Sequence, residues 1–234
     1  MILLIIFIFI IIALVYIIKN KIVIRVDTFF RKGFEKHDDK YGVYCFCREA
    51  TATGKTYSII DALESLSKGK TVITNVKSYY NSHKDNTIYE TDFGNIYEML
   101  RNLENCSDYI IFYDEIFTLI EKGKLSREML SFISQMRKRN LYLYTTAQEW
   151  LEINVTFRRY VRYCVECKMK NFKLFKCAFS INIIKDAYQM KWDNLENEYV
   201  CPIIKTTVKK CSKKIADSYD TFEVIKTSGK LTAK

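Results

Sequence analysis

The chain has 234 residues, of which 49% are hydrophobic and 15% aromatic, and this composition excludes wholesale disorder. Its 7 glycines and 1 proline exclude collagen-like and Pro-rich linker proteins, and its 2 histidines exclude a multi-histidine metal centre. The 37 basic and 27 acidic residues give a net charge of +10, which favours a polyanionic partner: nucleic acid, a nucleotide or an anionic membrane. An ordinary lysine-rich surface gives the same balance, so composition alone does not decide.

The chain begins with an unbroken apolar run, MILLIIFIFIIIALVYII, at residues 1–18. This run has the length of a membrane-spanning helix and lacks the basic start and small-x-small site of a cleaved signal peptide. Basic residues follow it, beginning with Lys19 and Lys21. The positive-inside rule therefore predicts a single-pass transmembrane anchor at 1–18 with the rest of the chain in the cytoplasm. A buried core helix or strand is the alternative.

Residues 19–40 are charged and predict a juxtamembrane linker or a helix that lies near the membrane. Beyond them, short apolar runs predict four strands, at 42–47, 71–76, 109–113 and 141–146. Helical periodicity predicts the segments between, one ending at Gly69 and two capped by Asp92 and Ser126. Strands that alternate with helices indicate an α/β fold with a mainly parallel sheet.

The character of the chain changes beyond residue 155. Two strand-rich runs, 160–169 and 172–183, flank Lys170–Asn171 and predict a hairpin that extends the sheet. The last stretch, 205–234, is basic and polar and is predicted to be a flexible tail whose lysines contact DNA phosphates, anionic lipid or only solvent.

The segment EATATGKT at 49–56 fits the phosphate-loop pattern G-x-x-x-x-G-K-[ST] in all but its first position, where Glu49 replaces Gly. It lies between a predicted strand and a predicted helix, as that motif requires. We expect the segment to bind the phosphates of a nucleotide through seven residues: Ala50, Thr51, Ala52, Thr53, Gly54, Lys55 and Thr56. Lys55 would neutralise the phosphates and the Thr56 hydroxyl would bind Mg²⁺. A lysine-capped turn is the alternative.

The strand YIIFY at 109–113 ends in Asp114 and Glu115. Acids at the carboxyl end of a strand lie where α/β sheets bind ligands. Asp114 is therefore predicted to hold Mg²⁺ and Glu115 to accept the proton of the attacking water. Gln148 follows the fourth strand and is a candidate for orienting that water.

Arginines flank the fourth strand and are candidates for an arginine finger that reaches a neighbouring subunit. They are Arg137, Arg139, Arg158 and Arg159. For each one taken singly, an ordinary surface charge or a nucleic-acid contact is the alternative.

The chain resembles the FtsK–HerA branch of P-loop motor ATPases, and within it the Zot-like family, the zonula-occludens-toxin domain of filamentous-phage assembly proteins. Four segments carry the resemblance, in the same order: ATATGKT (50–56), TVITNV (71–76), YIIFYDE (109–115) and QMRKRNLYLYTTAQ (135–148). The last one maps Arg137 and Gln148 onto the family's arginine and terminal glutamine. Two features depart from the family: Glu49 in place of glycine, and an anchor that precedes the ATPase domain.

The resemblance implies a P-loop NTPase three-layer sandwich at 41–204 that hydrolyses ATP with Mg²⁺ and works as a homo-oligomeric ring. It also reaches the genome-packaging ATPases of membrane-containing viruses. The implied function is a membrane-anchored ATPase for viral DNA packaging, translocation or virion assembly, on the inner membrane of the host cell. The implied partners are DNA and viral capsid or assembly proteins.

Two other functions stay open at this point. A nucleotide-dependent protein that assembles a membrane complex without moving DNA fits the same motifs, and so, less well, does a small-molecule kinase. The 8 cysteines include Cys164 and Cys167, which suggest half of a zinc site. In a strand, however, residues three apart face opposite sides, which favours small buried hydrophobic residues instead.

Overall fold

The computed structural model describes residues 2–19, 22–24, 41–47, 54–116, 126–148, 150–151, 153, 155–172, 177–193 and 198–220. The helices are α1 (Ile2–Lys19), α2 (Lys55–Leu66), α3 (Lys77–Ser82), α4 (Phe93–Leu100), α6 (Arg127–Gln135), α7 (Val155–Arg158) and α8 (Lys213–Ala216). The strands are β1 (Ile22–Ile24), β2 (Gly42–Cys47), β3 (Thr71–Thr74), β4 (Thr87–Tyr89), β5 (Tyr109–Tyr113), β6 (Tyr142–Ala147), β7 (Val161–Phe172), β8 (Cys177–Asp186), β9 (Lys191–Asp193), β10 (Glu198–Val200) and β11 (Ile203–Lys210).

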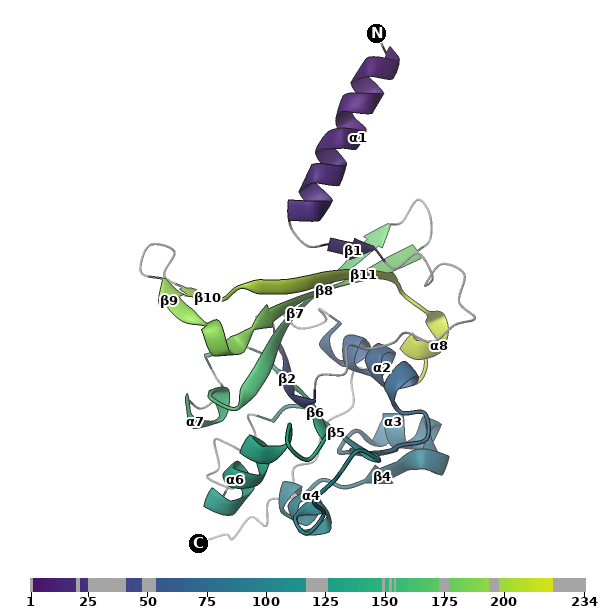
Figure 1. The fold of residues 1–234 in the computed structure, drawn as a ribbon. Helices are drawn as coiled ribbons and strands as arrows, with labels where there is room; N and C mark the ends of the chain where they lie inside the picture. The colour runs from purple at the N-terminus through teal and green to yellow at the C-terminus, as the bar shows by residue number, and fades with distance from the viewer. Residues whose placement is uncertain are drawn as a thin grey trace, which may run out of the picture.

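A nine-stranded sheet in the order β1-β11-β8-β7-β2-β6-β5-β3-β4 organises the molecule (Figure 1). Six neighbouring strands, from β4 to β7, are all parallel, and β8 then runs antiparallel between β7 and β11. Because β6 lies between β2 and β5, the carboxyl ends of these three strands meet at one edge. The predicted α/β fold with a mainly parallel sheet is confirmed.

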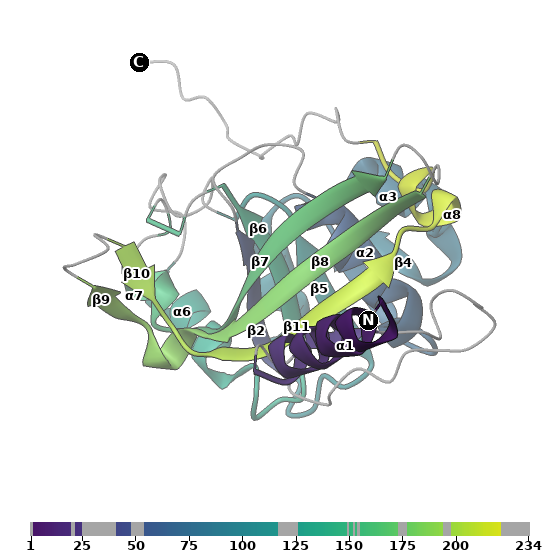
Figure 2. The same cartoon turned by 90° about the horizontal axis from the view of Figure 1, so that it is seen from above.

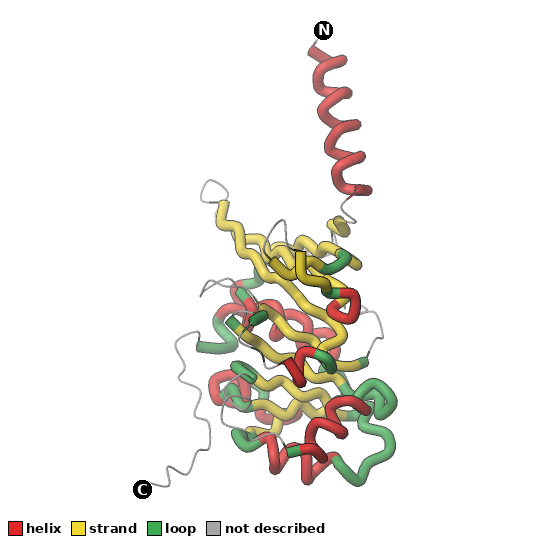
Figure 3. Tube along the Cα trace, turned by 90° about the vertical axis from the view of Figure 1, so that its left-hand side faces the viewer, coloured by secondary structure: helices red, strands yellow, loops and turns green. Residues whose placement is uncertain are grey.

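Two apolar clusters cover the two faces of the sheet, which gives three layers (Figure 3). Within β6, Tyr142 and Tyr144 contribute to the cluster under α2, α3 and α8, whereas Leu143 and Ala147 contribute to the cluster under α4, α6 and α7. This alternation follows from the two-residue period of a strand. Both faces of the central strands are buried, as the continuous apolar runs in the sequence indicate.

Two predicted helix caps are present. The Asp92 side chain accepts a hydrogen bond from the Gly94 amide at 2.8 Å, and the Ser126 hydroxyl accepts one from the Met129 amide at 3.3 Å. Each cap satisfies an amide that the first helical turn leaves without a partner. The predicted hairpin is also present, as β7 and β8, although Lys170 and Asn171 lie within β7 and the pairing continues to Phe172 and Cys177.

The N-terminal helix α1 projects from the body beside β1 (Figure 1). Its described side chains from Ile6 to Ile18 are apolar and, except for Ile17, exposed. In the part of the chain that the structure describes, no helix is long and apolar enough to cross a membrane. The predicted transmembrane anchor therefore stays a prediction.

Two sequence-based boundaries were wrong. Ile22–Ile24, within the predicted linker 19–40, is a strand that pairs with β11, and the predicted tail 205–234 begins inside β11 itself. Thr206, Thr207 and Lys209 are buried there. The lysines of β11 suggested an exposed tail, because the sequence does not show which distant residues can pair with a buried lysine. Residues 25–40 and 221–234 lie outside the described residues.

Candidate active site

The first residues of α2 carry the described part of the phosphate-loop motif. Gly54 precedes the helix with φ of +86°, a left-handed conformation that favours glycine. A Cβ at this position would lie 2.6 Å from Cγ and Sδ of Met169 in β7, so any other residue would also require the Met169 side chain to shift. Lys55 and Thr56 then form the first turn of α2, half-buried at the end of β2. The predicted residues Ala50, Thr51, Ala52 and Thr53 lie outside the described residues.

Asp114 follows β5 and is buried at the same edge of the sheet. Its carboxylate accepts a hydrogen bond from the Thr56 hydroxyl at 3.5 Å and a second from the Thr146 hydroxyl. The structure thus brings together the two residues predicted to hold Mg²⁺. A hydroxyl and a carboxylate are the hard oxygen donors that this ion prefers, so the pair fits it.

Asn75, the residue that follows β3, holds the backbone of Asp114 in place. The Asn75 side chain donates to the Asp114 carbonyl at 3.0 Å and accepts from the Asp114 amide at 2.8 Å. Asn75 itself is buried. A two-way amide bond of this kind holds both position and orientation, because a shift of either backbone group breaks one of the two bonds.

Glu115 has a φ of +54°, which is uncommon for a residue other than glycine. Its amide donates to the Thr146 hydroxyl at 2.9 Å, and the next amide, of Ile116, donates to the Thr146 carbonyl at 3.3 Å. Such backbone strain costs on the order of 1 kcal/mol and persists where the surroundings impose it. The carboxylate of Glu115 is half-buried and stands next to Asp114 at the ligand-binding edge of the sheet.

Sequence reasoning did not identify Thr146 and Asn75 as site residues. The only signal is their position: each is a polar residue at the carboxyl end of a strand neighbouring β5. A third residue without a sequence signal is Tyr219, half-buried after α8. Burial, and after it the charge of Asp114, raises the pKa of Tyr219 to about 12, so the described end of the chain lies near the site.

The pKa of the Asp114 carboxyl is raised to about 6. Burial is the largest cause, the hydrogen bond from Thr146 opposes it, and the charge of Glu115 raises it further. Lys55 lies close enough for its positive charge to lower this pKa. A buried carboxylate that carries its charge with difficulty gains from a cation placed beside it, as a bound Mg²⁺ would be.

Asp114→Asn is expected to stabilise the nucleotide-free protein near pH 8. The folded chain holds the Asp114 proton more tightly than the unfolded chain does, so the free energy of unfolding falls as pH rises from about 4 to about 6. Above about pH 6 the full loss of stability persists. At 1.36 kcal/mol per pKa unit this cost is roughly 3 kcal/mol. Urea unfolding of parent and variant near pH 4 and near pH 8 measures it. An Asn variant that gains no more near pH 8 than near pH 4 would contradict the assignment.

The other predicted residues fall into two groups. Gln148 comes directly after β6, half-buried at the same edge as Asp114 and Thr56. Arg137 is exposed and lies in the turn that leads into β6, at the opposite edge of the sheet. A strand of six residues separates the two edges by about 20 Å. Arg137 therefore does not belong to the site of its own chain.

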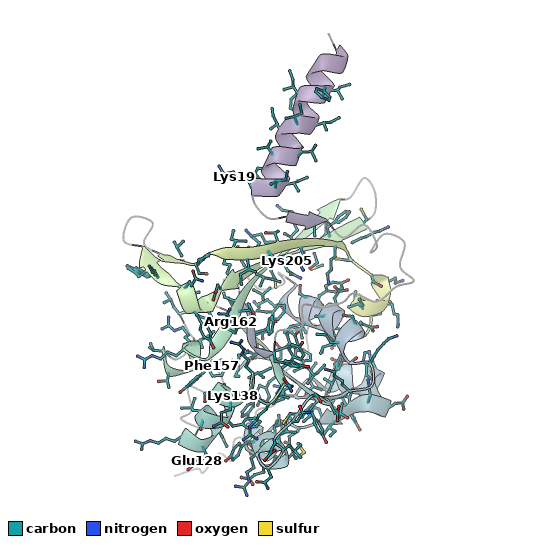
Figure 4. The ribbon with its side chains drawn as sticks, in the orientation of Figure 1. Lys19, Glu128, Lys138, Phe157, Arg162 and Lys205 are labelled. Carbon is teal, nitrogen blue, oxygen red and sulfur yellow. The ribbon has the colours of Figure 1, made fainter. Side chains whose placement is uncertain are left out.

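Arg139 has a structural role. Its guanidinium donates to the carbonyls of Arg101 and Leu103, both at 2.8 Å, where α4 ends. These carbonyls have no partner within the helix, and a cation near the C-terminus of a helix also interacts favourably with the helix dipole. Arg139 is thus engaged within the fold, which argues against its use as an arginine finger. Lys138, the residue before Arg139 in the chain, is labelled in Figure 4.

Helix α2 is held from the side opposite the central strands by β8, β11 and the segment before α8. The Lys209 ammonium donates to the Asp61 carboxylate at 2.7 Å, and both side chains are buried, at 8% and 2% exposure. The Ser58 hydroxyl donates to the Asn182 side chain at 2.8 Å, and the Tyr57 hydroxyl accepts from the Ser212 amide at 2.7 Å. Contacts from three residues of α2 thus fix the helix that carries Lys55 and Thr56.

The cysteines that suggested half of a zinc site, Cys164 and Cys167, both lie in β7. Within the described residues, no three His, Cys, Asp or Glu side chains are grouped so as to hold a metal ion. Cys164 faces the cluster under α4 and α6, whereas Cys167 faces the cluster under α2. The Sγ atoms of Cys47 and Cys164 lie 3.1 Å apart. Their hydrogen bond raises the pKa of Cys164, and burial raises it further. The same bond lowers the pKa of Cys47, but a hydrogen bond with Cys45 and burial outweigh it, so that the pKa of Cys47 is raised too. All 8 cysteines are free; Cys177 and Cys211 are half-buried and the others are buried.

No family model and no curated protein sequence matches the chain. Similar solved structures include the N-terminal domain of zonular occludens toxin from Neisseria meningitidis, at 14% identity and a TM-score of 0.44, covering 77% of this chain and 100% of that one. They also include the genome packaging NTPase B204 from Sulfolobus turreted icosahedral virus 2, in complex with sulfate, at 13% identity and a TM-score of 0.44, covering 72% and 100%. A third is the flagellar accessory protein FlaH from Methanocaldococcus jannaschii, at 11% identity and a TM-score of 0.41, covering 80% and 93%.

The chain is similar to Zot-domain and viral genome-packaging proteins. The resemblance predicted from the sequence is confirmed. B204 has also been solved with ATP-gammaS and with AMPPCP. The identities and TM-scores are low, so no residue role and no activity is transferred from these proteins. What the chain does has to be argued from its own site.

Proposed function

We propose that this chain is an ATPase that binds Mg²⁺–ATP at the edge formed by the ends of β2, β5 and β6. The observation that carries the proposal is the hydrogen bond from Thr56 to Asp114, because it joins the end of the phosphate-loop motif to an acid 58 residues away. Bound Mg²⁺ would neutralise charge that develops on the phosphates. Thr56 and Asp114 would hold the ion, and Lys55 would bind the β- and γ-phosphates.

Glu115 is placed to act as the general base. It is the titratable side chain next to Asp114, on a strained turn that Thr146 holds in place. A half-buried carboxylate can accept the proton of a water molecule that attacks the γ-phosphate. Gln148, at the end of the intervening strand, is placed to orient that water. Arg137 is exposed at the far edge, so it serves as an arginine finger only towards the nucleotide of a neighbouring subunit in a ring.

We also propose that α1 anchors the chain in the inner membrane of a host cell, with the remainder in the cytoplasm. Support comes from its apolar side chains, exposed on nearly all sides, and from Lys19 at its cytoplasmic end. An apolar surface of this size is stable only when removed from water. At 1.5 Å per residue the 18 residues span about 27 Å, slightly less than the hydrocarbon core of about 30 Å, and local thinning of the bilayer together with Lys19 reaching the interface accommodates the difference.

The work done with ATP is proposed to be the packaging, translocation or export of viral DNA. Support is the resemblance of four segments, in order, to viral motor ATPases, together with a net charge of +10. The partners are then DNA, further copies of this chain in a ring, and viral capsid or assembly proteins. ATP hydrolysis by the full chain in detergent or vesicles, with and without single- and double-stranded DNA, tests this. Stimulation by DNA is expected, and hydrolysis unaffected by either DNA would favour a protein that assembles a membrane complex without moving DNA.

A further inference from the structure

The strands β7, β8 and β11 have one face packed on α2 and another that no described helix covers. Ser58 of α2 is hydrogen-bonded to Asn182 and lies 3.2 Å from the Ser180 hydroxyl, so these residues of β8 point towards α2. Ile181 and Ile183, which alternate with them, therefore point away from it. The same reasoning applies to β11, where Lys209 points towards α2.

We call this second surface the outer face, and define it by six residues: Lys168, Lys170, Ile181, Ile183, Val208 and Lys210. The strand register places Ile181 directly between Lys168 and Val208. The side chains are half-buried, except for that of Lys170, which is exposed. An apolar centre with lysines around it is the arrangement that binds a surface with an apolar interior and anionic groups.

Glu166 and Lys185 lie on the same side of the sheet as the six residues of the outer face, and the charge there stays positive when both are counted. Glu166 bonds Lys168 at 2.9 Å and Lys185 at 3.0 Å, which places all three side chains on the same face. Glu166 neutralises one of these two lysines. Lys170 and Lys210 contribute two further positive charges, so the face keeps a net charge of three.

The outer face and α1 point in the same direction. Figure 1 shows α1 rising from the side of the sheet away from α2, and Figure 2, from above, shows β7, β8 and β11 spread beside the end-on helix. β1 links the two, because it follows α1 and pairs with β11. If α1 enters a bilayer, this face is brought close to the lipid headgroups.

We propose that the outer face is a docking surface for anionic phospholipid headgroups. The inference rests on the proposed anchoring by α1, which sets the orientation. DNA is the other polyanion to consider, but phosphate contacts alone do not account for isoleucine and valine at the centre of the face. Contact with the membrane holds β11 at the bilayer, and through Lys209 and Asp61 it also fixes the orientation of α2 and of the active site.

The test separates the two membrane contacts within the full chain. Phe9→Arg with Ile12→Arg places charges in α1, so that binding to vesicles then depends on the outer face alone. In this background we expect binding to phosphatidylcholine vesicles that contain phosphatidylserine, and none without it. Adding Lys170→Glu and Lys210→Glu should weaken binding at least roughly twentyfold, because each lysine near an anionic surface contributes roughly fivefold. The matched control is Lys84→Glu with Lys138→Glu, two exposed lysines outside this face.

The outcomes are distinct. Equal loss in the test and control variants would overturn the proposal, as would vesicle binding that does not depend on phosphatidylserine. Loss of DNA binding by the test variant, with vesicle binding unchanged, would overturn it in favour of DNA. Failure of the parent chain to bind neutral vesicles would contradict anchoring by α1, while the comparison of variants on anionic vesicles would still decide the role of the outer face.

Discussion

Glu115→Gln should hydrolyse ATP roughly a hundredfold or more slowly than the parent chain, which is the scale of losing a general base. Glutamine keeps the size of the side chain and leaves the bond from the residue 115 amide to Thr146 intact. The strained turn therefore survives, and binding of Mg²⁺–ATP should change little. A loss in kcat with unchanged binding indicates an interaction made mainly in the transition state.

The measurement is steady-state hydrolysis together with the binding of a fluorescent ATP analogue. Glu104→Gln is the matched control, because Glu104 is exposed on the segment after α4 and belongs to no site. Asp114→Asn provides the contrast, since it removes the proposed Mg²⁺ ligand and should weaken Mg²⁺-dependent binding itself. If Glu115→Gln hydrolyses ATP at the parental rate, Glu115 is not the general base.

Breaking the ion pair between Asp61 and Lys209 should lower the free energy of unfolding by about 3–5 kcal/mol, because either change leaves a buried charge without its partner. Lys209→Met tests this with little change in volume. Asp61→Leu together with Lys209→Met should recover most of the loss, since a buried apolar pair replaces the ion pair at little or no net cost.

Urea unfolding of the single and double variants measures the coupling between the two residues. Arg101→Met is the matched control, because Arg101 pairs with Glu98 at 2.8 Å on the surface, where such pairs contribute about 0–1 kcal/mol. A Lys209→Met variant no less stable than Arg101→Met would show that the buried pair does not hold α2 against β11.

The central part of the fold was predictable because its signals are local. The runs at 42–47 and 109–113 are continuously apolar, as strands buried on both faces must be, and Asp92 and Ser126 are capping residues placed before periodic apolar positions. The outer strand β11 was not predictable in this way. Lys209 is charged, and only the position of Asp61, 148 residues earlier in the chain, makes its burial in β11 favourable.

The candidate site shows the same division. Thr56 and Asp114 belong to sequence motifs that predict a phosphate and Mg²⁺ site, and the structure brings the two residues together. Asn75 and Thr146 act through hydrogen bonds to the backbone of Asp114 and Glu115, and a polar residue at the end of a strand has many other uses. Arg139 was one of several arginine-finger candidates on the ground of its charge alone, and its guanidinium binds the carbonyls at the end of α4.

The measurement that tests the proposed ATPase most directly is hydrolysis of Mg²⁺–ATP by the parent chain and by Lys55→Ala, prepared identically. Lys55 is half-buried at the start of α2 and belongs to neither apolar cluster, and its proposed role is to supply charge to the phosphates. Lys84→Ala, at an exposed lysine, is the control. We expect the parent and the control to hydrolyse ATP and Lys55→Ala to lose the activity, with all three unfolding at the same urea concentration. Hydrolysis by Lys55→Ala at the parental rate would contradict a phosphate site at this position.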